Sequence, residues 1–135
     1  MHDLHNNIKV VHAITPQAVG TTGASNGKLS AVVDRAGYES CEFVFSSGAS
    51  ATVADTITPI VYESDTATVA GFSAVADADL VGSETALTLT AAKSGKVGYK
   101  GGKRYVGLRL YSVGTATAIV GAVAILGNPR NAPVS

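Results

Sequence analysis

Short segments in which apolar residues alternate with polar ones recur along the chain, and turn residues separate them. In Tyr38–Phe45 the residues Cys41, Phe43 and Phe45 share one face, which is the period of a half-buried strand. Lys103–Tyr111 alternates in the same way. No segment keeps the 3.6-residue period of an amphipathic helix, and Leu, Glu, Lys and Gln are too scarce to fill a helical bundle. The pattern therefore predicts an all-β protein.

We expect about eight to ten short strands, with near-regular spacing between them. The candidate segments are Ile8–Ile14, Leu29–Val33, Tyr38–Phe45, Ala51–Val53, Ile57–Glu63, Thr68–Val75, Thr85–Ala91, Lys96–Lys100, Lys103–Tyr111 and Thr115–Leu126. Pro59 places its strand at an edge or a bulge, because proline cannot donate to a ladder. Thr115–Leu126 is apolar on both faces, so it belongs in the centre of a sheet or between two layers. Turns are expected at Asp34–Gly37, Lys93–Gly95 and Gly101–Gly102.

These strands predict one antiparallel β-sandwich domain over residues 1–135, with a jelly-roll-like arrangement. Residues 1–7 form an N-terminal extension, and 128–135 form a C-terminal tail. Pro129 and Pro133 keep that tail out of a long ladder. A chain of 135 residues buries enough surface to fold without disulfides or metal.

Composition excludes several classes of protein. The chain has 46% hydrophobic residues and no net charge, so it is neither disordered nor a basic nucleic-acid binder. One cysteine excludes a disulfide scaffold. Only 15% of the residues are charged, against about 25% in an average domain. We expect other copies of the protein to cover part of so uncharged a surface.

The zero net charge hides a division along the chain. All ten acidic residues lie at or before Glu84, with three basic ones among them, which gives −7. Residues 85–135 carry seven basic residues and no acid, which gives +7. Three interpretations remain open: strands that neutralise each other within the sandwich, opposed acidic and basic sides that suit head-to-tail contacts, or a nucleic-acid site on Lys96–Arg109 with Tyr99 and Tyr105 as stacking residues.

Candidate catalytic and metal-binding residues are few, and we expect neither an enzyme nor a cofactor. His2, His5 and His12 match no zinc spacing. Cys41 lies on an apolar strand face, where a small buried residue is expected rather than a nucleophile. Four acidic residues could offer oxygen ligands to calcium but lack EF-hand spacing and are typical turn residues: Glu63, Asp65, Asp77 and Asp79. Gly101-Gly102 precedes no helix, so it is not a phosphate-binding loop.

Membrane and export signals are weak. The N-terminus lacks a basic region followed by an apolar stretch, so no secretory signal is expected. Leu110–Pro129 is uncharged, but its apolar part, Ala118–Leu126, is shorter than the roughly 20 residues of a membrane helix. A buried strand is the preferred interpretation, with a membrane helix as a minor alternative.

Several segments resemble a family of small proteins from the structural-gene regions of tailed phages and prophages. The resemblance is carried by Val97–Val106, Leu108–Leu110, Gly114–Ala118 and Ala124–Val134, with Asp3–Val10 and Phe72–Leu80 also similar. It implies a virion structural protein on the capsid surface, made in the host cytoplasm. Its role would be that of a decoration (cement) subunit or a vertex turret or spike-base subunit.

The partners implied are copies of the chain itself, as a trimer or pentamer, the major capsid protein, and other head or spike proteins. Neither nucleic acid nor membrane is expected as a partner. The candidate interface residues are Lys96, Lys100, Lys103, Arg104, Arg109, Arg130 and Val134. The alternative is a glycan- or receptor-binding β-sandwich module of a phage tail or spike, using exposed aromatics over a shallow groove. Five tyrosines could supply it: Tyr38, Tyr62, Tyr99, Tyr105 and Tyr111.

Overall fold

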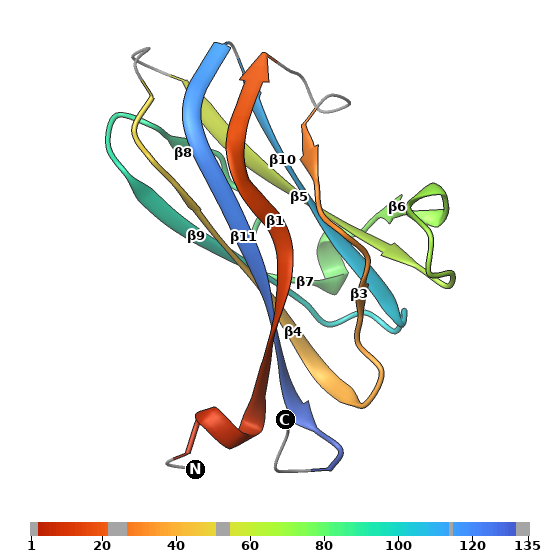
Figure 1. Ribbon diagram of the computed structural model, residues 1–135. Helices are drawn as coiled ribbons and strands as arrows, with labels where there is room; N and C mark the ends of the chain where they lie inside the picture. Colours follow the sequence, from red (N-terminus) through yellow and green to blue (C-terminus); the bar gives the residue numbers. More distant parts are fainter. Residues whose placement is uncertain (1–2, 22–26, 51–54, 114, 132–135) are drawn as a thin grey trace.

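The computed structural model describes residues 3–21, 27–50, 55–113 and 115–131. The strand predicted at Ala51–Val53 and the candidate interface residue Val134 lie outside these ranges. The described chain consists of strands and three short 3-10 helices, η1 (His5–Asn7), η2 (Val69–Gly71) and η3 (Asp77–Asp79). Two sheets face each other in Figure 1, and every strand pair is antiparallel. The predicted all-β antiparallel sandwich is confirmed.

The β11 sheet has the strand order β1-β11-β4-β9-β7. Its strands are β1 (Ile8–Thr21), β11 (Thr115–Pro129), β4 (Tyr38–Ser47), β9 (Lys93–Tyr99) and β7 (Leu80–Val81). The β10 sheet has the order β2-β10-β5-β6, with β3 also on β10 and β8 also on β5. Its strands are β2 (Lys28–Leu29), β10 (Tyr105–Val113), β5 (Thr56–Ser64), β6 (Ser73–Ala74), β3 (Val33–Asp34) and β8 (Leu87–Thr88).

The core lies between the two sheets and uses the alternation seen in the sequence. Cys41, Phe43 and Phe45 of β4 are buried, as predicted. The alternating residues of β10 face them from the other sheet, and Leu108 and Leu110 are fully buried. Burying such side chains stabilises the fold by about 1.5–3 kcal/mol each. Strand period alone thus identifies the inward face of both long central strands.

Several predicted boundaries are wrong. The strand predicted at Leu29–Val33 is divided into β2 and β3, and Thr68–Val75 contains η2 and only the two-residue strand β6. Two other boundaries have a packing reason. β1 does not end before Pro16 but continues to Thr21, with register shifts around the proline. An edge strand tolerates a proline, because its free side needs no N–H donor. Lys93–Gly95 is the start of β9 rather than a turn. A Cβ at Gly95 would come within 2.5 Å of the Phe45 ring, so this glycine is a packing contact.

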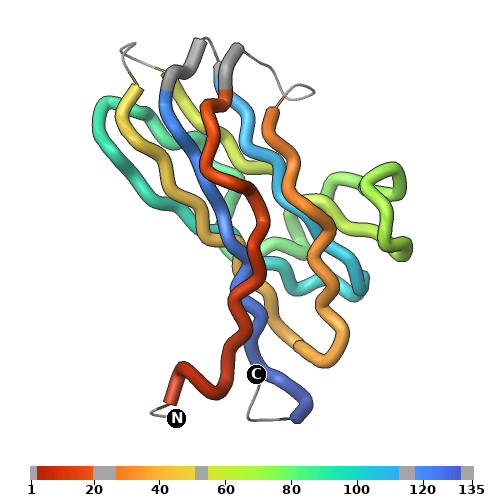
Figure 2. The backbone as a smooth tube through the Cα atoms, viewed as in Figure 1, coloured from red at the N-terminus to blue at the C-terminus, as the bar shows by residue number. Residues whose placement is uncertain are grey.

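β11 lies inside its sheet, between β1 and β4, as its apolar sequence predicts (Figure 2). The alternative of a membrane helix over Leu110–Pro129 is wrong, because the described residues of this range belong to β10, up to Val113, and to β11, from Thr115. No helix in the described ranges is long and apolar enough to cross a membrane. One face of β11 packs on the core, and the other, with Ile119 and Val123, faces away from it.

Both termini of the sandwich differ in part from the expected extensions. Residues 5–7 form η1, and Asp3, which precedes it, accepts hydrogen bonds from Asn6. At the other end β11 runs to Pro129, so 128–129 are strand residues and not the start of a tail. η1 and the end of β11 lie at the same end of the molecule (Figure 1).

β5 has a gap along the side that faces away from β10. β8 pairs with Thr56 and Ile57, and β6 pairs with Tyr62 and Glu63. Pro59 lies between these two paired segments and has no N–H that would be left without a partner. The predicted edge position of Pro59 is therefore correct for this stretch of β5. Two residues on, the Val61 N–H donates to Glu84 Oε1 at 2.7 Å. Proline and a carboxylate therefore close an edge that no described strand covers.

Candidate functional site

The seven candidate interface residues do not form one patch. Lys103, Arg104 and Arg130 line a single cleft at the end of the sandwich. Lys96 lies on the outer face of the β11 sheet, and the Lys100 N–H, just after β9, donates to Asp79 O at 2.9 Å. Arg109 lies on the outer face of the β10 sheet, 5.3 Å from the Tyr62 ring centroid. Val134 is outside the described residues.

Ion pairs join the acidic and basic parts of the chain. Lys103 Nζ lies 2.5 Å from Asp65 Oδ2, and Arg104 Nη2 lies 2.8 Å from Asp34 Oδ2. Arg130 Nε lies 2.7 Å from a Glu39 oxygen. Each pair links a base after residue 85 to an acid before it, as neutralisation within the sandwich predicts. Hydrogen bonds from Arg104 lower the pKa of Asp34 to about 2, against the opposing effect of burial.

The cleft has a volume of about 300 Å³ and lies where three segments meet. The turn after β3 supplies Arg35 to Tyr38, the β9–β10 loop supplies Gly102 to Arg104, and the end of β11 supplies Arg130. The pairing of Tyr105 with Asp34 brings the first two segments together. Sequence reasoning missed Arg35, because nothing in the sequence shows that its turn meets the β9–β10 loop.

Arg35 holds one wall of the cleft. Its Nε donates to Lys103 O at 3.1 Å and its Nη2 donates to Gly101 O at 3.0 Å. The guanidinium carbon lies 4.7 Å from the centroid of the Tyr99 ring, a cation–π distance. Nη1 is buried and has no hydrogen-bond partner among the residues described. The guanidinium is therefore fixed by carbonyls and a ring, not by a carboxylate.

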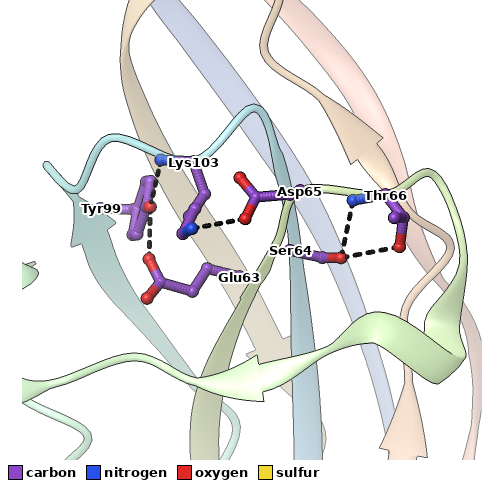
Figure 3. A network of polar contacts seen from close by, with 6 residues as sticks. All are labelled: Glu63, Ser64, Asp65, Thr66, Tyr99 and Lys103. Atoms are coloured by element: carbon purple, nitrogen blue, oxygen red, sulfur yellow. Dashed lines mark hydrogen bonds and ion pairs between the residues drawn. The ribbon is translucent and has the colours of Figure 1, made fainter.

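A second set of contacts fixes the same loop from the other side (Figure 3). The Tyr99 hydroxyl donates to Glu63 Oε2 at 2.5 Å and accepts the Lys103 N–H at 2.9 Å. Burial, and then the hydrogen bond to Glu63, raise the pKa of Tyr99 to about 12. Beside it, Thr66 N–H donates to Ser64 Oγ at 3.0 Å. The β9–β10 loop is thus tied to the end of β5 before any ligand arrives.

The outer face of the β11 sheet is the second candidate surface. One row of paired residues crosses all five strands of the sheet, and a second row lies beside it. The first row is Val10, Ile125, Glu42, Gly98 and Val81, and the second is His12, Val123, Val44 and Lys96. Val10 is 59% exposed, Val81 53% and Ile119, further along β11, 55%. A solvated sheet face is normally polar, so the composition of this face is unusual.

Two charged residues in these rows have opposite signs. Glu42 lies over Gly98, and a Cβ on that glycine would come within 2.6 Å of its Oε2. Burial raises the pKa of Glu42, and Lys96 partly offsets this. The two rows are therefore neutral as well as largely apolar, and no net charge on them opposes the approach of an uncharged protein surface.

A groove of about 290 Å³ lies on the same face, where the pairing register of β1 shifts around Pro16. His12 and Pro16 form one side of it, Val44 the other, and Gly121 and Val123 lie between them. A Cβ at Gly121 would lie 3.3 Å from Pro16 Cγ, so the glycine keeps the groove open. The groove is large enough to receive an apolar side chain from another molecule.

The outer face of the β10 sheet gathers aromatic side chains. The rings of Tyr62 and Phe72 stack with centroids 5.9 Å apart and planes inclined by 22°. Arg109 lies over Tyr62, and the Arg104 guanidinium lies 5.0 Å from the centroid of Tyr105. Tyr62 and Phe72 contact each other, and a guanidinium group lies over Tyr62 and another over Tyr105, which reduces the ring surface open to a ligand.

The sequence candidates for chemistry are dispersed. Cys41 is buried, and burial raises its pKa to about 12, which removes the thiolate needed for nucleophilic attack. His5 and His12 are exposed, while His2 lies outside the described residues. Glu63 and Asp65 are engaged with Tyr99 and Lys103. Within the described ranges, no three His, Cys, Asp or Glu side chains lie close enough to hold a metal ion.

No protein-family model and no curated protein matches this sequence. Solved structures show distant similarity. The N-terminal CBM22-1–GH10 modules of Clostridium thermocellum endo-1,4-β-D-xylanase 10B, complexed with xylohexaose, match 97% of this chain at 12% identity, with a TM-score of 0.49. This chain spans 28% of that one.

Two other structures match at lower scores. The K1 cleaved adhesin domain of Porphyromonas gingivalis Lys-gingipain matches 94% of this chain, and this chain covers 86% of it, at 15% identity and a TM-score of 0.44. The N-terminal cellulose-binding domain of Cellulomonas fimi β-1,4-glucanase C matches 90% of this chain, which covers 86% of it, at 10% identity and a TM-score of 0.40. Similarity at this level says nothing about what this chain binds.

Proposed function

We propose that this chain is a bacteriophage virion structural protein, which binds copies of itself and the capsid surface as a decoration, turret or spike-base subunit. The observation that carries the binding role is the outer face of the β11 sheet. It is largely apolar across five strands, contains a groove at Pro16, and has one charge of each sign in its two central rows. The virion context comes from the sequence resemblance.

The occupant of this face is a second copy of the chain. A neutral face of valine, isoleucine and glycine loses little hydration energy when a similar surface covers it, and it gains about 25 cal/mol for each Å² of apolar area buried. Glu42 and Lys96 leave no net charge to oppose that contact. In a trimer or pentamer the contact is head-to-tail, so this face would meet a different uncharged surface of the next copy. Such a ring would leave the ends of the sandwich free to bind the capsid shell.

Sedimentation equilibrium and light scattering test self-association. We expect the wild-type protein to have the mass of three or five copies, and the double variant Val10→Lys, Ile119→Lys to be a monomer. The matched control is Val69→Lys. Val69 is 47% exposed in η2, away from this face, so its replacement should leave the oligomer intact. A wild-type protein that stays monomeric at roughly millimolar concentration, where association stronger than about −4 kcal/mol is visible, would contradict the proposal.

The capsid role needs a separate test. We expect the gene to lie beside a major capsid gene, and the purified protein to co-sediment with shells of that capsid protein. A gene among tail-fibre genes, together with no binding to shells, would refute the capsid role and leave self-association standing.

Glycan binding is a second candidate, and the aromatic residues on the outer face of the β10 sheet favour it. Tyr62, Phe72 and Tyr105 are all half-buried there, beside Arg109. Aromatic rings with a polar neighbour are a common sugar-binding surface. A glycan array with hits that disappear in Phe72→Ala would support it, whereas an array without hits would eliminate it.

A further inference from the structure

The cleft at the end of the sandwich contains one cation that forms no ion pair with a described carboxylate. Four cations line it: Arg35, Lys103, Arg104 and Arg130. Three carboxylates pair with the last three of these, and Arg35 is held by carbonyl oxygens instead. Glu63 lies near the same loop but hydrogen-bonds to the Tyr99 hydroxyl, not to Arg35. The Arg35 guanidinium is therefore a cation without a paired carboxylate, in a place where the backbone is fixed on both sides.

The three paired cations still have donors to offer. Arg104 uses Nε and Nη2 on Asp34, and Arg130 uses Nε on Glu39. The remaining guanidinium nitrogens of Arg104 and Arg130 have no hydrogen-bond partner in the described part of the chain. Their side chains are 57% and 69% exposed, so a ligand can reach them. Exposed ion pairs are weak, at about 0–1 kcal/mol, and can rearrange around an incoming anion.

Two glycines line the cleft and leave room for a side chain. A Cβ added to Gly37 or to Gly102 would find no atom within 4 Å. Gly37 has a φ of +87°, which other residues rarely adopt, whereas Gly102 has no such constraint. A side chain at Gly102 can therefore be introduced without strain and would project into open space beside the cations.

We infer that this cleft binds one oxyanion of the carboxylate, phosphate or sulfate class. Guanidinium groups recognise such anions by paired N–H donors, and a volume of about 300 Å³ accommodates one with its water. The Tyr99–Glu63–Lys103 contacts and the Arg35 hydrogen bonds hold the β9–β10 loop in place, so little reorganisation accompanies binding. The site stands independently of the self-association proposed above. Its anion is either a free ion or a carboxylate on a neighbouring protein.

NMR titration of ¹⁵N-labelled protein with sodium phosphate, at ionic strength held constant with sodium chloride, tests the site. We expect saturable shifts of the Gly37 and Gly102 amides and of the Arg130 side-chain signal. In Gly102→Glu, an internal carboxylate occupies the cleft and phosphate affinity falls at least about tenfold. Lys96→Gln changes the net charge by the same amount outside the cleft, and it should stay near wild type. Gly102→Gln separates the charge of the new side chain from its bulk.

The outcomes distinguish the source of the anion. Phosphate binding with an unchanged solution mass in Gly102→Glu supports a free ion as the ligand. Acetate binding together with a reduced mass in Gly102→Glu, but not in Gly102→Gln, supports a carboxylate from another copy. Shifts that do not saturate, or an equal loss of affinity in Gly102→Glu and Lys96→Gln, would overturn the site while leaving the β11 face untouched.

Discussion

The hydroxyl of Tyr99 connects the core to the β9–β10 loop, and its removal has a calculable cost. The ring is 2% exposed, and the hydroxyl donates to Glu63 Oε2 and accepts the Lys103 N–H. A hydrogen bond to a charged group contributes about 1.5–3 kcal/mol and a neutral one about 1 kcal/mol. Tyr99→Phe keeps the ring and its contact with Arg35. We therefore expect the free energy of unfolding to fall by about 2–3 kcal/mol.

Urea denaturation followed by circular dichroism measures this change. With a slope of about 1–3 kcal/mol/M, the unfolding midpoint should fall by roughly 1 M. Tyr105→Phe is the matched control, since the Tyr105 hydroxyl has no hydrogen-bond partner in the described ranges. Its substitution should change stability by no more than about 0.5 kcal/mol. Equal midpoints for the two variants would refute the role assigned to the Tyr99 hydroxyl.

The pKa of Tyr99 adds a pH signature. Burial and the Glu63 hydrogen bond raise this pKa to about 12, from an ordinary value of 10.0. The folded state therefore favours the neutral phenol, and the stability that it contributes is complete below pH 10. This contribution is lost as the pH rises from 10 to 12. The difference between wild type and Tyr99→Phe should narrow across that window, and a constant difference would contradict the assignment.

Two further substitutions test other contacts. Gly107→Ala puts a Cβ within 2.5 Å of the Phe72 ring, so the ring must move off Tyr62 and the free energy of unfolding should fall by about 1 kcal/mol. Gly102→Ala, which meets no atom within 4 Å, should leave stability unchanged. Thermal unfolding of the two variants distinguishes these outcomes. Asp34→Asn removes a carboxylate whose pKa Arg104 lowers to about 2. Wild type should lose stability as the pH falls from about 4 to 2, and this loss should be largely absent from the variant. Parallel acid-unfolding curves would show that the pair does not stabilise the fold.

The strands that sequence periodicity identified best are those with one core face. β4 and β10 each present alternate residues to the core, and Phe43 and Leu108 are buried where the period of two places them. Thr85–Ala91 alternates as clearly, yet only Leu87–Thr88 is strand. Leu89 is buried there without a ladder, because burial of a side chain does not require strand pairing. Periodicity thus predicts the inward face more reliably than the length of a strand.

The basic cleft could be predicted only in part. The cations Lys103, Arg104 and Arg130 stand out in the sequence, because acids are missing from the last third of the chain. Arg35 joins these cations because β3 pairs with β10 over a long range in the sequence. Arg109 stays apart from them because the alternation within β10 places it on the outer face of the sheet. Local sequence specifies which residues are charged, and the register of distant strands decides which of them meet.

The closed edge of β5 has a consequence for how copies can assemble. Pro59 offers no donor, and Glu84 takes the Val61 N–H on the side that no described strand covers at that point. An open strand edge would recruit further strands and favour fibres or disordered precipitates. Because this edge is blocked, another molecule cannot add a strand to the sheet there. Close contacts between molecules must then form through the sheet faces. A protein that has to collect at high local density without aggregating benefits from that restriction.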